Sequence, residues 1–365
     1  GFSVVAQAVE ACARRQWIDP LKDYFASLQG VWDGQPRLAT WLAVYMGAVH
    51  STYSQEVGTR WLISAVARAL EPGAKADCVL VFEGGQGAKK STALEALAPS
   101  RELFFDDEIK IGSKEAAETI RGKWIIELGE LSALSRSDLE STKAFVTRRV
   151  DTYRPSFGRY SRDFKRRCIF AGSTNQGEYL VDSTGNRRWW PVRCEVTHLI
   201  DLAALREDRD QLWAEALALY QAGAEWWVER NTELEALCVA EQTEREKVHP
   251  WTEKIEPWLA NQIERADVLH HTPRPANVAC PCLDCAGVTV GAILAGAMAL
   301  DPGKWTTGDA AAVAGILRAL GWAKPPRDQR RQAGPRVRPF WPAGHAQLVD
   351  RQADPEAGGC HTVTD

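Results

Sequence analysis

The stretch of sequence that decides the fold, residues 78–97, reads CVLVFEGGQGAKKSTALEAL. It opens on a short, continuous apolar run, residues 78–82, which is typical of a strand buried on both faces of a parallel sheet. A glycine-rich turn and a Lys-Ser pair follow, and residues 93–97 have the spacing of a helix. A strand, a glycine-rich turn, a Lys-Ser pair and a helix, in that order, are what a phosphate-binding loop requires.

In such a loop, glycines let successive backbone N–H groups turn toward phosphate oxygens, and the helix N-terminus adds its positive dipole end. We expect Lys90 to reach the β- and γ-phosphates of ATP and Ser91 to bind Mg²⁺. The residues expected to surround the nucleotide are Gly84, Gly85, Gln86, Gly87, Ala88, Lys89, Lys90, Ser91 and Thr92. Lys89 stands where the usual pattern has glycine, a strained choice if φ is positive there. The alternative is a plain glycine-rich turn beside two surface lysines.

Three further short apolar runs predict strands, at residues 123–127, 167–172 and 188–192. Helical patterns lie between the first three of the four runs. Strands that alternate with helices indicate a parallel sheet with right-handed crossovers. The sequence therefore predicts an α/β fold, preceded by a helical region over residues 1–70.

Polar side chains follow two of these runs, at the edge where parallel sheets bind ligands. We expect Glu127 to hold Mg²⁺ and Glu130 to activate the attacking water, with the division of roles open. Asn175 would position that water against the γ-phosphate. Arg187 directly precedes the fourth run and Arg188 is its first residue. A guanidinium there would stabilise charge on the transferred phosphoryl group, in its own or a neighbouring subunit. The alternatives are two solvated acids and an arginine pair before an edge strand.

Positive charge concentrates between residues 143 and 167 of a chain whose formal net charge is −4. Tyr153, Phe157 and Tyr160 are interleaved with the basic residues. Basic side chains meet phosphates and aromatic rings stack on bases, so we expect a hairpin that contacts nucleic acid. The residues expected to make these contacts are Lys143, Arg148, Arg149, Arg154, Arg159 and Tyr160. A solvated surface hairpin is the alternative.

The composition sets the broad class of protein. With 365 residues, 45% of them hydrophobic and 25% charged, the chain is neither collagen-like nor wholly disordered. No apolar stretch approaches the roughly 20 residues that cross a bilayer, and the N-terminus lacks the basic segment of a signal peptide. Nine cysteines without an export signal indicate reduced thiols, so we expect a cytoplasmic protein with no membrane partner. A missing initiator Met predicts a piece of a longer product.

Together, these motifs resemble the virulence-associated protein E family of phage and genomic-island ATPases, which are similar to superfamily 3 and phage primase-associated helicases. The resemblance covers residues 19–194 well and the C-terminal part more loosely. It rests on the phosphate-loop residues 84–92 and on the segments WDGQPR (32–37), ELGE (127–130), GSTN (172–175) and TGNRR (184–188), together with Lys143, Asp151 and Arg154.

The resemblance implies a P-loop NTPase core of the AAA+-like, superfamily 3 helicase type. It implies a homo-oligomeric ring, such as a hexamer, that moves along single-stranded or forked DNA when a mobile element replicates. Lys143, Asp151 and Arg154 would belong to a hairpin that faces the central channel. Arg187 or Arg188 would reach into a neighbour's site. Family proteins are often fused to an upstream primase domain, which makes a primase domain or protein an expected partner.

The C-terminal part contains a cysteine cluster and a compact unit. His270, Cys280, Cys282 and Cys285 offer four ligands for Zn²⁺. Their spacing lacks the second separated pair of the strong zinc signatures, so reduced thiols in a surface insert are the alternative. Farther along, two helical patterns, a basic turn and a strand-like end resemble a winged helix-turn-helix, which would bind DNA or dock a protein. Thr307 or Asp309 is expected to cap its second helix.

The expected regions are a helical region at 1–70, an ATPase core at 71–200, a helical extension at 201–265, a Cys/His-containing insert or linker at 266–287, a winged-helix-like domain at 288–345 and a loose tail at 346–365. The leading hypothesis for function is an ATP-dependent DNA helicase or translocase. The alternative is an ATP-binding, DNA-associated regulator or loader that does not unwind. A small-molecule kinase fits the same loop, but the basic aromatic hairpin argues against it.

Overall fold

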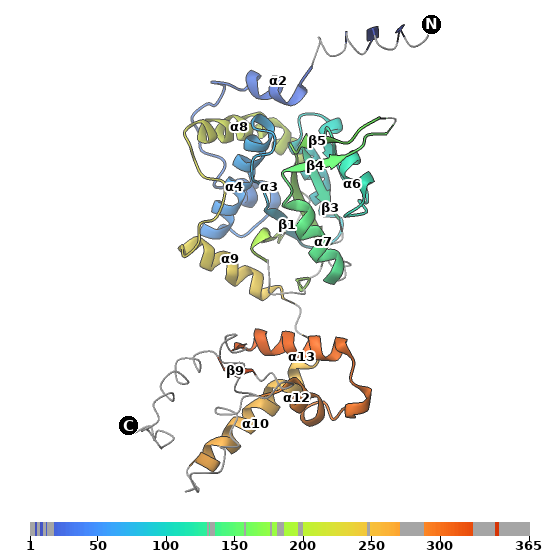
Figure 1. Ribbon diagram of the computed structural model, residues 1–365. Helices are drawn as coiled ribbons and strands as arrows, with labels where there is room; N and C mark the ends of the chain where they lie inside the picture. The colour runs from blue at the N-terminus through green and yellow to red at the C-terminus, as the bar shows by residue number, and fades with distance from the viewer. Residues whose placement is uncertain are drawn as a thin grey trace, which may run out of the picture. The chain divides into compact units, whose positions relative to one another are not determined.

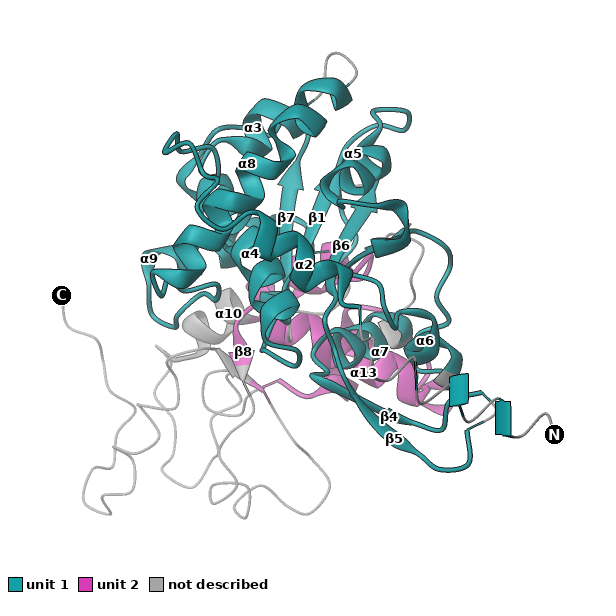
Figure 2. Ribbon diagram, turned by 90° about the horizontal axis from the view of Figure 1, so that it is seen from above, with its two compact units in different colours: residues 1–247 teal, residues 248–365 magenta. Residues whose placement is uncertain are grey.

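The structure is a computed structural model, and it describes most of the chain in two compact units, residues 1–247 and 248–365 (Figures 1 and 2). The described residues are 18–129, 136–156, 158–175, 177–180, 186–195, 200–246, 249–270, 288–323 and 340–342, with isolated positions elsewhere. The first unit contains the sheet and every described residue of the nucleotide motifs.

A five-stranded parallel sheet forms the centre of the first unit, which confirms the predicted α/β class. Its strand order is β2-β3-β6-β1-β7. The strands are β2 (Phe104–Phe105), β3 (Ile125–Leu128), β6 (Ile169–Thr174), β1 (Val79–Glu83) and β7 (Trp189–Arg193). Each predicted strand is present and begins one or two residues later than expected. The sequence did not indicate β2, because two residues are too few to show a strand pattern.

Alternate residues of β1 enter two separate hydrophobic cores, which explains its unbroken apolar run. Leu80 and Phe82 pack into the larger core, and Val79 and Val81 into the smaller one. The helices that supply the larger core are α2 (Pro20–Ser27), α3 (Trp41–Met46), α4 (Thr52–Leu70), α5 (Lys90–Leu97), α8 (Leu202–Gln221) and α9 (Glu233–Glu244). The smaller core contains residues of α6 (Lys114–Thr119) and α7 (Arg136–Val146).

A separate antiparallel hairpin is built from β4 (Val150–Tyr153) and β5 (Arg162–Lys165). Asp151 pairs with Phe164, and Tyr153 pairs with Arg162. In Figure 1 the two strands project beside α6, away from the helices that cover the larger core. The basic segment therefore forms a hairpin attached to the sheet domain and is no part of the sheet itself.

The second unit is small and mostly helical. Its elements are α10 (Thr252–His270), α12 (Val290–Gly296), α13 (Thr307–Ala319) and the short paired strands β8 (Trp322–Ala323) and β9 (Trp341–Pro342). The expectation that Thr307 or Asp309 caps α13 was wrong, because the N-cap residue is Thr306. The Asp309 side chain accepts a hydrogen bond from the Thr306 backbone N–H and so completes a capping box. No helix of the described residues is long and apolar enough to cross a membrane.

Two of the expected boundaries also shift. The border between the compact units falls after residue 247, inside the region expected as a helical extension at 201–265. Helix α10 continues to His270, past the expected start of the Cys/His insert at residue 266.

Candidate functional site

The glycine-rich loop links β1 to α5 and contains backbone that only small or strained residues adopt. Gly84 has φ 147°, and a Cβ atom there would lie 2.7 Å from the Cys194 carbonyl oxygen. Gly87 has φ 83°. Lys89 has φ 64° and ψ 29°, so the residue that departs from the usual glycine is held in the left-handed region. A non-glycine residue there costs about 1–2 kcal/mol, which the surrounding loop must offset.

Lys90 is the first residue of α5, and its side chain folds back over the loop. Its Nζ donates to the carbonyl oxygens of Gly84 and Gly85, both at 2.8 Å. Burial lowers the pKa of the Lys90 ammonium below its usual value, while the nearby Cys194 and Glu127 oppose that shift. The loop thus holds a buried ammonium group on its own backbone, where an anionic ligand would exchange for the carbonyl contacts.

Ser91 and Glu127 meet across the gap between α5 and β3. Ser91 Oγ donates to Glu127 Oε1 at 2.8 Å, and Ser173 Oγ donates to the same oxygen at 2.7 Å. Glu127 is 3% exposed, and its other oxygen, Oε2, is buried without a hydrogen-bond partner among the described residues. A buried carboxylate oxygen without a donor is costly and is suited to a cation.

Asn175 lies at the same end of the sheet as the loop. β6 is the neighbour of β1, with Thr174 opposite Glu83, and the Gly84 N–H donates to the Thr174 carbonyl at 3.2 Å. Asn175 follows directly and is exposed. The structure therefore brings together the loop, Glu127 and Asn175, while Glu130 lies outside the described residues.

Arg187 and Arg188 lie at the opposite end of the sheet. β7 runs parallel to β1 with Trp189 opposite Val79, so both arginines precede the edge where β1 begins. The five residues of β1 span roughly 16 Å between that edge and the loop. Arg187 is exposed, and Arg188 Nε donates to Thr147 Oγ1 at 3.1 Å. Neither arginine is placed to act on the loop of its own chain.

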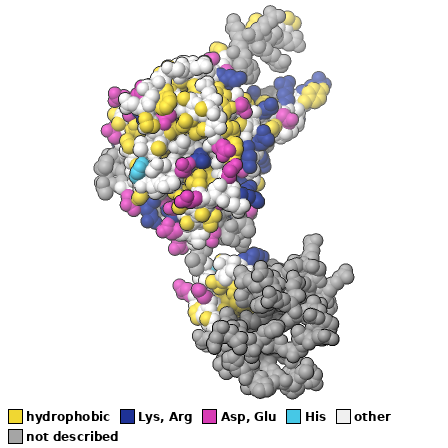
Figure 3. All heavy atoms as spheres, turned by 90° about the vertical axis from the view of Figure 1, so that its left-hand side faces the viewer, with side chains coloured by type: hydrophobic (Ala, Val, Ile, Leu, Met, Phe, Trp, Pro, Cys, Tyr) yellow, Lys and Arg dark blue, Asp and Glu magenta, His cyan; other side chains and the backbone are white. Residues whose placement is uncertain are grey.

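The exposed residues of the hairpin are the ones best suited to contact nucleic acid. Arg154 and Arg159 are exposed, and Tyr160 is 68% exposed with the Arg159 guanidinium 5.8 Å from its ring centre. Arg148 and Arg149, just before β4, are exposed as well. Figure 3 shows Lys and Arg side chains gathered along one margin of this unit.

Lys143 requires a correction. It lies on α7 and outside the hairpin to which the resemblance assigned it. It is 4% exposed, and its Nζ donates to Glu140 Oε1 at 2.8 Å. Because the ammonium group is buried and paired, this arrangement does not present Lys143 to a nucleic acid.

Arg166 and Arg167 contribute to the positive charge of the segment but are structural. Arg166 Nε and Nη2 bind both oxygens of Asp151, at 2.5 and 2.7 Å, and the pair is buried. This pairing joins the end of β5 to β4. Arg167 Nη1 binds Asp19 Oδ1 at 2.7 Å. Asp151 therefore holds the base of the hairpin together and does not extend from it.

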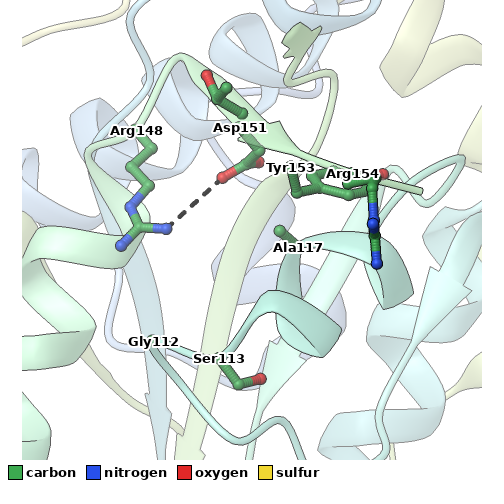
Figure 4. A pocket seen from close by; sticks show the side chains of 8 residues that line it. Gly112, Ser113, Ala117, Arg148, Asp151, Tyr153 and Arg154 are labelled. Carbon is green, nitrogen blue, oxygen red and sulfur yellow. Dashed lines mark ion pairs between the residues drawn. The ribbon is translucent and has the colours of Figure 1, made fainter. Parts of the chain in front are cut away.

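A hollow of about 380 Å³ lies where the hairpin meets the start of α6. Ser113, Ala117, Asp151 and Arg154 contribute to its lining. Figure 4 shows Arg148 directed toward Asp151, whose nearest atoms are 3.8 Å apart, with Arg154 across the hollow in this view. Two arginines beside one carboxylate leave the hollow basic.

Two important side chains escaped the sequence analysis, Glu83 at the end of β1 and Arg245 after α9. They form a buried pair, with Nε to Oε1 at 2.8 Å and Nη2 to Oε2 at 3.0 Å. Burial alone would lower the pKa of Arg245, but the bonds and charge of Glu83 raise it overall. The sequence did contain one signal of this pair: Glu83 ends an otherwise apolar strand, and a carboxylate buried there needs a positively charged partner.

The side chains predicted to bind zinc are not described by the structure. Cys280, Cys282 and Cys285 are not described, and nor is the side chain of His270. Within the described part of the chain, no group of three or more His, Cys, Asp and Glu side chains is placed to hold a metal.

Comparisons with known proteins address the family. Two solved structures of the NrS-1 C-terminal region are similar to this chain, both at 15% identity. One has a TM-score of 0.40 over 64% of this chain and 55% of the other, and the second 0.39 over 85% and 76%. A search of curated proteins finds no match. The family model of the virulence-associated protein E-like domain matches residues 26–247, more than half of the chain. This match confirms the resemblance, and the chain belongs to the virulence-associated protein E-like family.

Proposed function

We propose that this chain is an ATP-hydrolysing motor, a helicase or translocase, that acts on DNA in the replication of a phage or other mobile element. The observation that carries the proposal is the meeting of Ser91 and Glu127 beside the glycine-rich loop, with one buried carboxylate oxygen left unpaired. On this proposal the sheet domain is a P-loop NTPase core of the AAA+-like type.

The residues present fit a magnesium ion. Ser91 Oγ and Glu127 Oε2 would hold it, since Mg²⁺ takes a few oxygen ligands from protein and the rest from water and phosphate. When bound, the ion neutralises charge on the β- and γ-phosphates. Lys90 would leave the carbonyl oxygens of Gly84 and Gly85 to bind the same phosphates. The backbone N–H groups of the loop would donate hydrogen bonds to the phosphate oxygens.

Hydrolysis then needs a positioned water and a base. Asn175 would hold the water in line with the γ-phosphorus, and Glu130 would take its proton while the bond to the β–γ bridging oxygen breaks. The products are ADP and inorganic phosphate. Arg187 is the candidate that completes the site of a neighbouring copy, because it is exposed and far from its own loop. A homo-oligomeric ring follows from that role.

Single-stranded or forked DNA is the proposed polymer substrate. Arg154, Arg159 and Tyr160 offer two charges and one stacking face on an exposed hairpin. An upstream primase domain or protein is the proposed partner. The second unit is proposed to be a winged helix that contacts DNA or a protein. Zinc binding by the Cys/His cluster is a separate proposal, which rests on the sequence alone. The cytoplasm is the proposed location of this activity.

The test is strand separation on a fork labelled on one arm, with ATP, with the β,γ-imido analogue of ATP, and without nucleotide. A motor releases the labelled strand only with hydrolysable ATP, and Lys90→Ala abolishes release. Fork binding and ATP binding without release would favour the regulator or loader instead. No binding of either ligand would overturn both.

A further inference from the structure

Five backbone and side-chain groups that belong to distant parts of the candidate site meet at the C-terminal end of α9. The residues of α9 and its immediate continuation that receive them are Gln242, Arg245 and Glu246, here called the α9 terminus. The first contact is the buried ion pair of Arg245 with Glu83, whose side chains are 4% and 5% exposed. Glu83 is the last residue of β1, directly before the glycine-rich loop.

The second contact holds the segment that follows Asn175. The backbone N–H groups of Tyr179 and Leu180 both donate to the Arg245 carbonyl, at 3.1 and 3.0 Å. Tyr179 also donates its hydroxyl to Glu83 Oε1 at 2.9 Å. The strand that leads to the loop and the segment after Asn175 are therefore joined through Arg245, by its side chain and by its carbonyl group.

The third contact holds both sides of the arginine pair. Asn186, directly before Arg187, donates from Nδ2 to Glu246 Oε1 at 2.9 Å. Gln242 donates from Nε2 to the carbonyl oxygen of Trp189, directly after Arg188, at 2.8 Å. The α9 terminus thus reaches the loop strand, the Asn175 segment and the Arg187 segment at once.

We infer that Arg245 is a positioning residue for phosphate transfer, which fixes the strand that leads to the loop and the segment after Asn175 relative to one another. This inference rests on the proposed function and adds to it. Arg245 touches no part of the expected nucleotide path, so its loss leaves the loop able to bind ATP. What is lost is the alignment of groups that act only in the transition state, and such a loss lowers kcat more than binding.

The single variant Arg245→Met can lose activity by unfolding, so the double variant and Arg245→Lys described below separate loss of positioning from loss of folding. Arg245→Met leaves the Glu83 carboxylate buried without its partner, which destabilises the chain. The double variant Glu83→Gln with Arg245→Met removes both charges and leaves no unpaired ion. Arg245→Lys keeps the charge but loses the two-pronged geometry, so we expect it to recover part of the lost kcat.

A matched control loses stability elsewhere. Glu215 on α8 is buried, and its Oε2 accepts from the backbone N–H groups of Arg37 and Leu38, at 2.6 and 3.0 Å. Glu215→Ala therefore weakens the same unit without touching the α9 terminus. Urea midpoints of all variants establish that the compared proteins are folded.

The experiment measures kcat for ATP hydrolysis and, separately, the Kd of the β,γ-imido analogue of ATP. We expect both Arg245→Met and the double variant to lower kcat about tenfold or more while Kd changes less than about threefold, with Glu215→Ala near wild type in both. Equal loss of kcat and affinity, or unchanged kcat in the double variant, would overturn the positioning role. A wild-type chain without turnover would instead overturn the proposed function, and this inference with it.

Discussion

Ser91 Oγ lies 2.8 Å from Glu127 Oε1, although 36 residues separate the two in sequence. The contact joins the first turn of α5 to the end of β3 and leaves Oε2 of the buried carboxylate without a donor among the described residues. A hydroxyl and a carboxylate beside a glycine-rich loop are the protein ligands that hold Mg²⁺ in nucleotide sites of the P-loop type.

Glu127→Gln is expected to lower kcat for ATP hydrolysis by about 10²–10³-fold, because the amide keeps the hydrogen bonds from Ser91 and Ser173 but loses the charge. The measurement is steady-state turnover across a magnesium titration. Glu207→Gln, at an exposed position of α8, is the control and should behave as wild type. Turnover by Glu127→Gln equal to that of wild type would remove Glu127 from the metal site.

Mixing two inactive variants tests whether Arg187 acts on a neighbouring copy. Arg187→Ala and Lys90→Ala should each lose turnover alone, since one lacks the arginine and the other lacks the loop lysine. Mixed oligomers contain some interfaces where an intact loop faces an intact arginine, so part of the activity should return. Turnover by the mixture no greater than that of the two separate proteins would argue against a role in trans.

Two side chains of the hairpin are expected to contribute to DNA affinity in different ways, Arg154 through its charge and Tyr160 through stacking on a base. Arg154→Ala should reduce the slope of log K against log salt concentration by about 1, and Tyr160→Ala should weaken binding by about 1–3 kcal/mol with the slope unchanged. Fluorescence anisotropy with labelled single-stranded DNA at several salt concentrations measures both. Arg101→Ala removes a charge outside the hairpin and should change neither. Wild-type binding by both hairpin variants would exclude the hairpin as the DNA surface.

Stability should fall at alkaline pH because buried thiols resist ionisation. Burial raises the pKa of Cys194 to about 12, with Lys90 acting against this, whereas an unfolded thiol ionises near its usual value. The native thiol keeps a proton that the unfolded chain releases, so its contribution is complete below the unfolded pKa and is lost as pH rises toward 12. The loss is about 1.4 kcal/mol per pH unit. Urea unfolding of wild type and Cys194→Ala should converge or cross over that pH range. A constant difference between them would contradict the assignment.

Much of the sheet domain was predictable because its strands are buried on both faces. The unbroken apolar run of β1 reports directly that Leu80 and Val81 enter different cores. The loop was predictable for a similar reason, since glycine spacing and the Lys-Ser pair are local in sequence. The strand order was not, because the position of β1 between β6 and β7 depends on packing between distant segments.

The charged residues were harder to interpret, because a count of charges does not distinguish buried from exposed ones. Lys143 and Arg166 belong to the same basic stretch as Arg154, yet both are buried and paired within the domain. Arg245 was missed altogether, since 162 residues separate it from Glu83 and no local pattern links them. Helix caps were also off by a residue, as Thr306 shows.

The most direct test of the central claim is ATP hydrolysis by the purified chain, with magnesium, in the presence and absence of single-stranded DNA, beside Lys90→Ala. We predict turnover that DNA stimulates and that Lys90→Ala abolishes. A chain that hydrolyses no ATP under either condition, or a Lys90→Ala variant as active as wild type, would contradict the assignment of the glycine-rich loop and Glu127 as an ATP site.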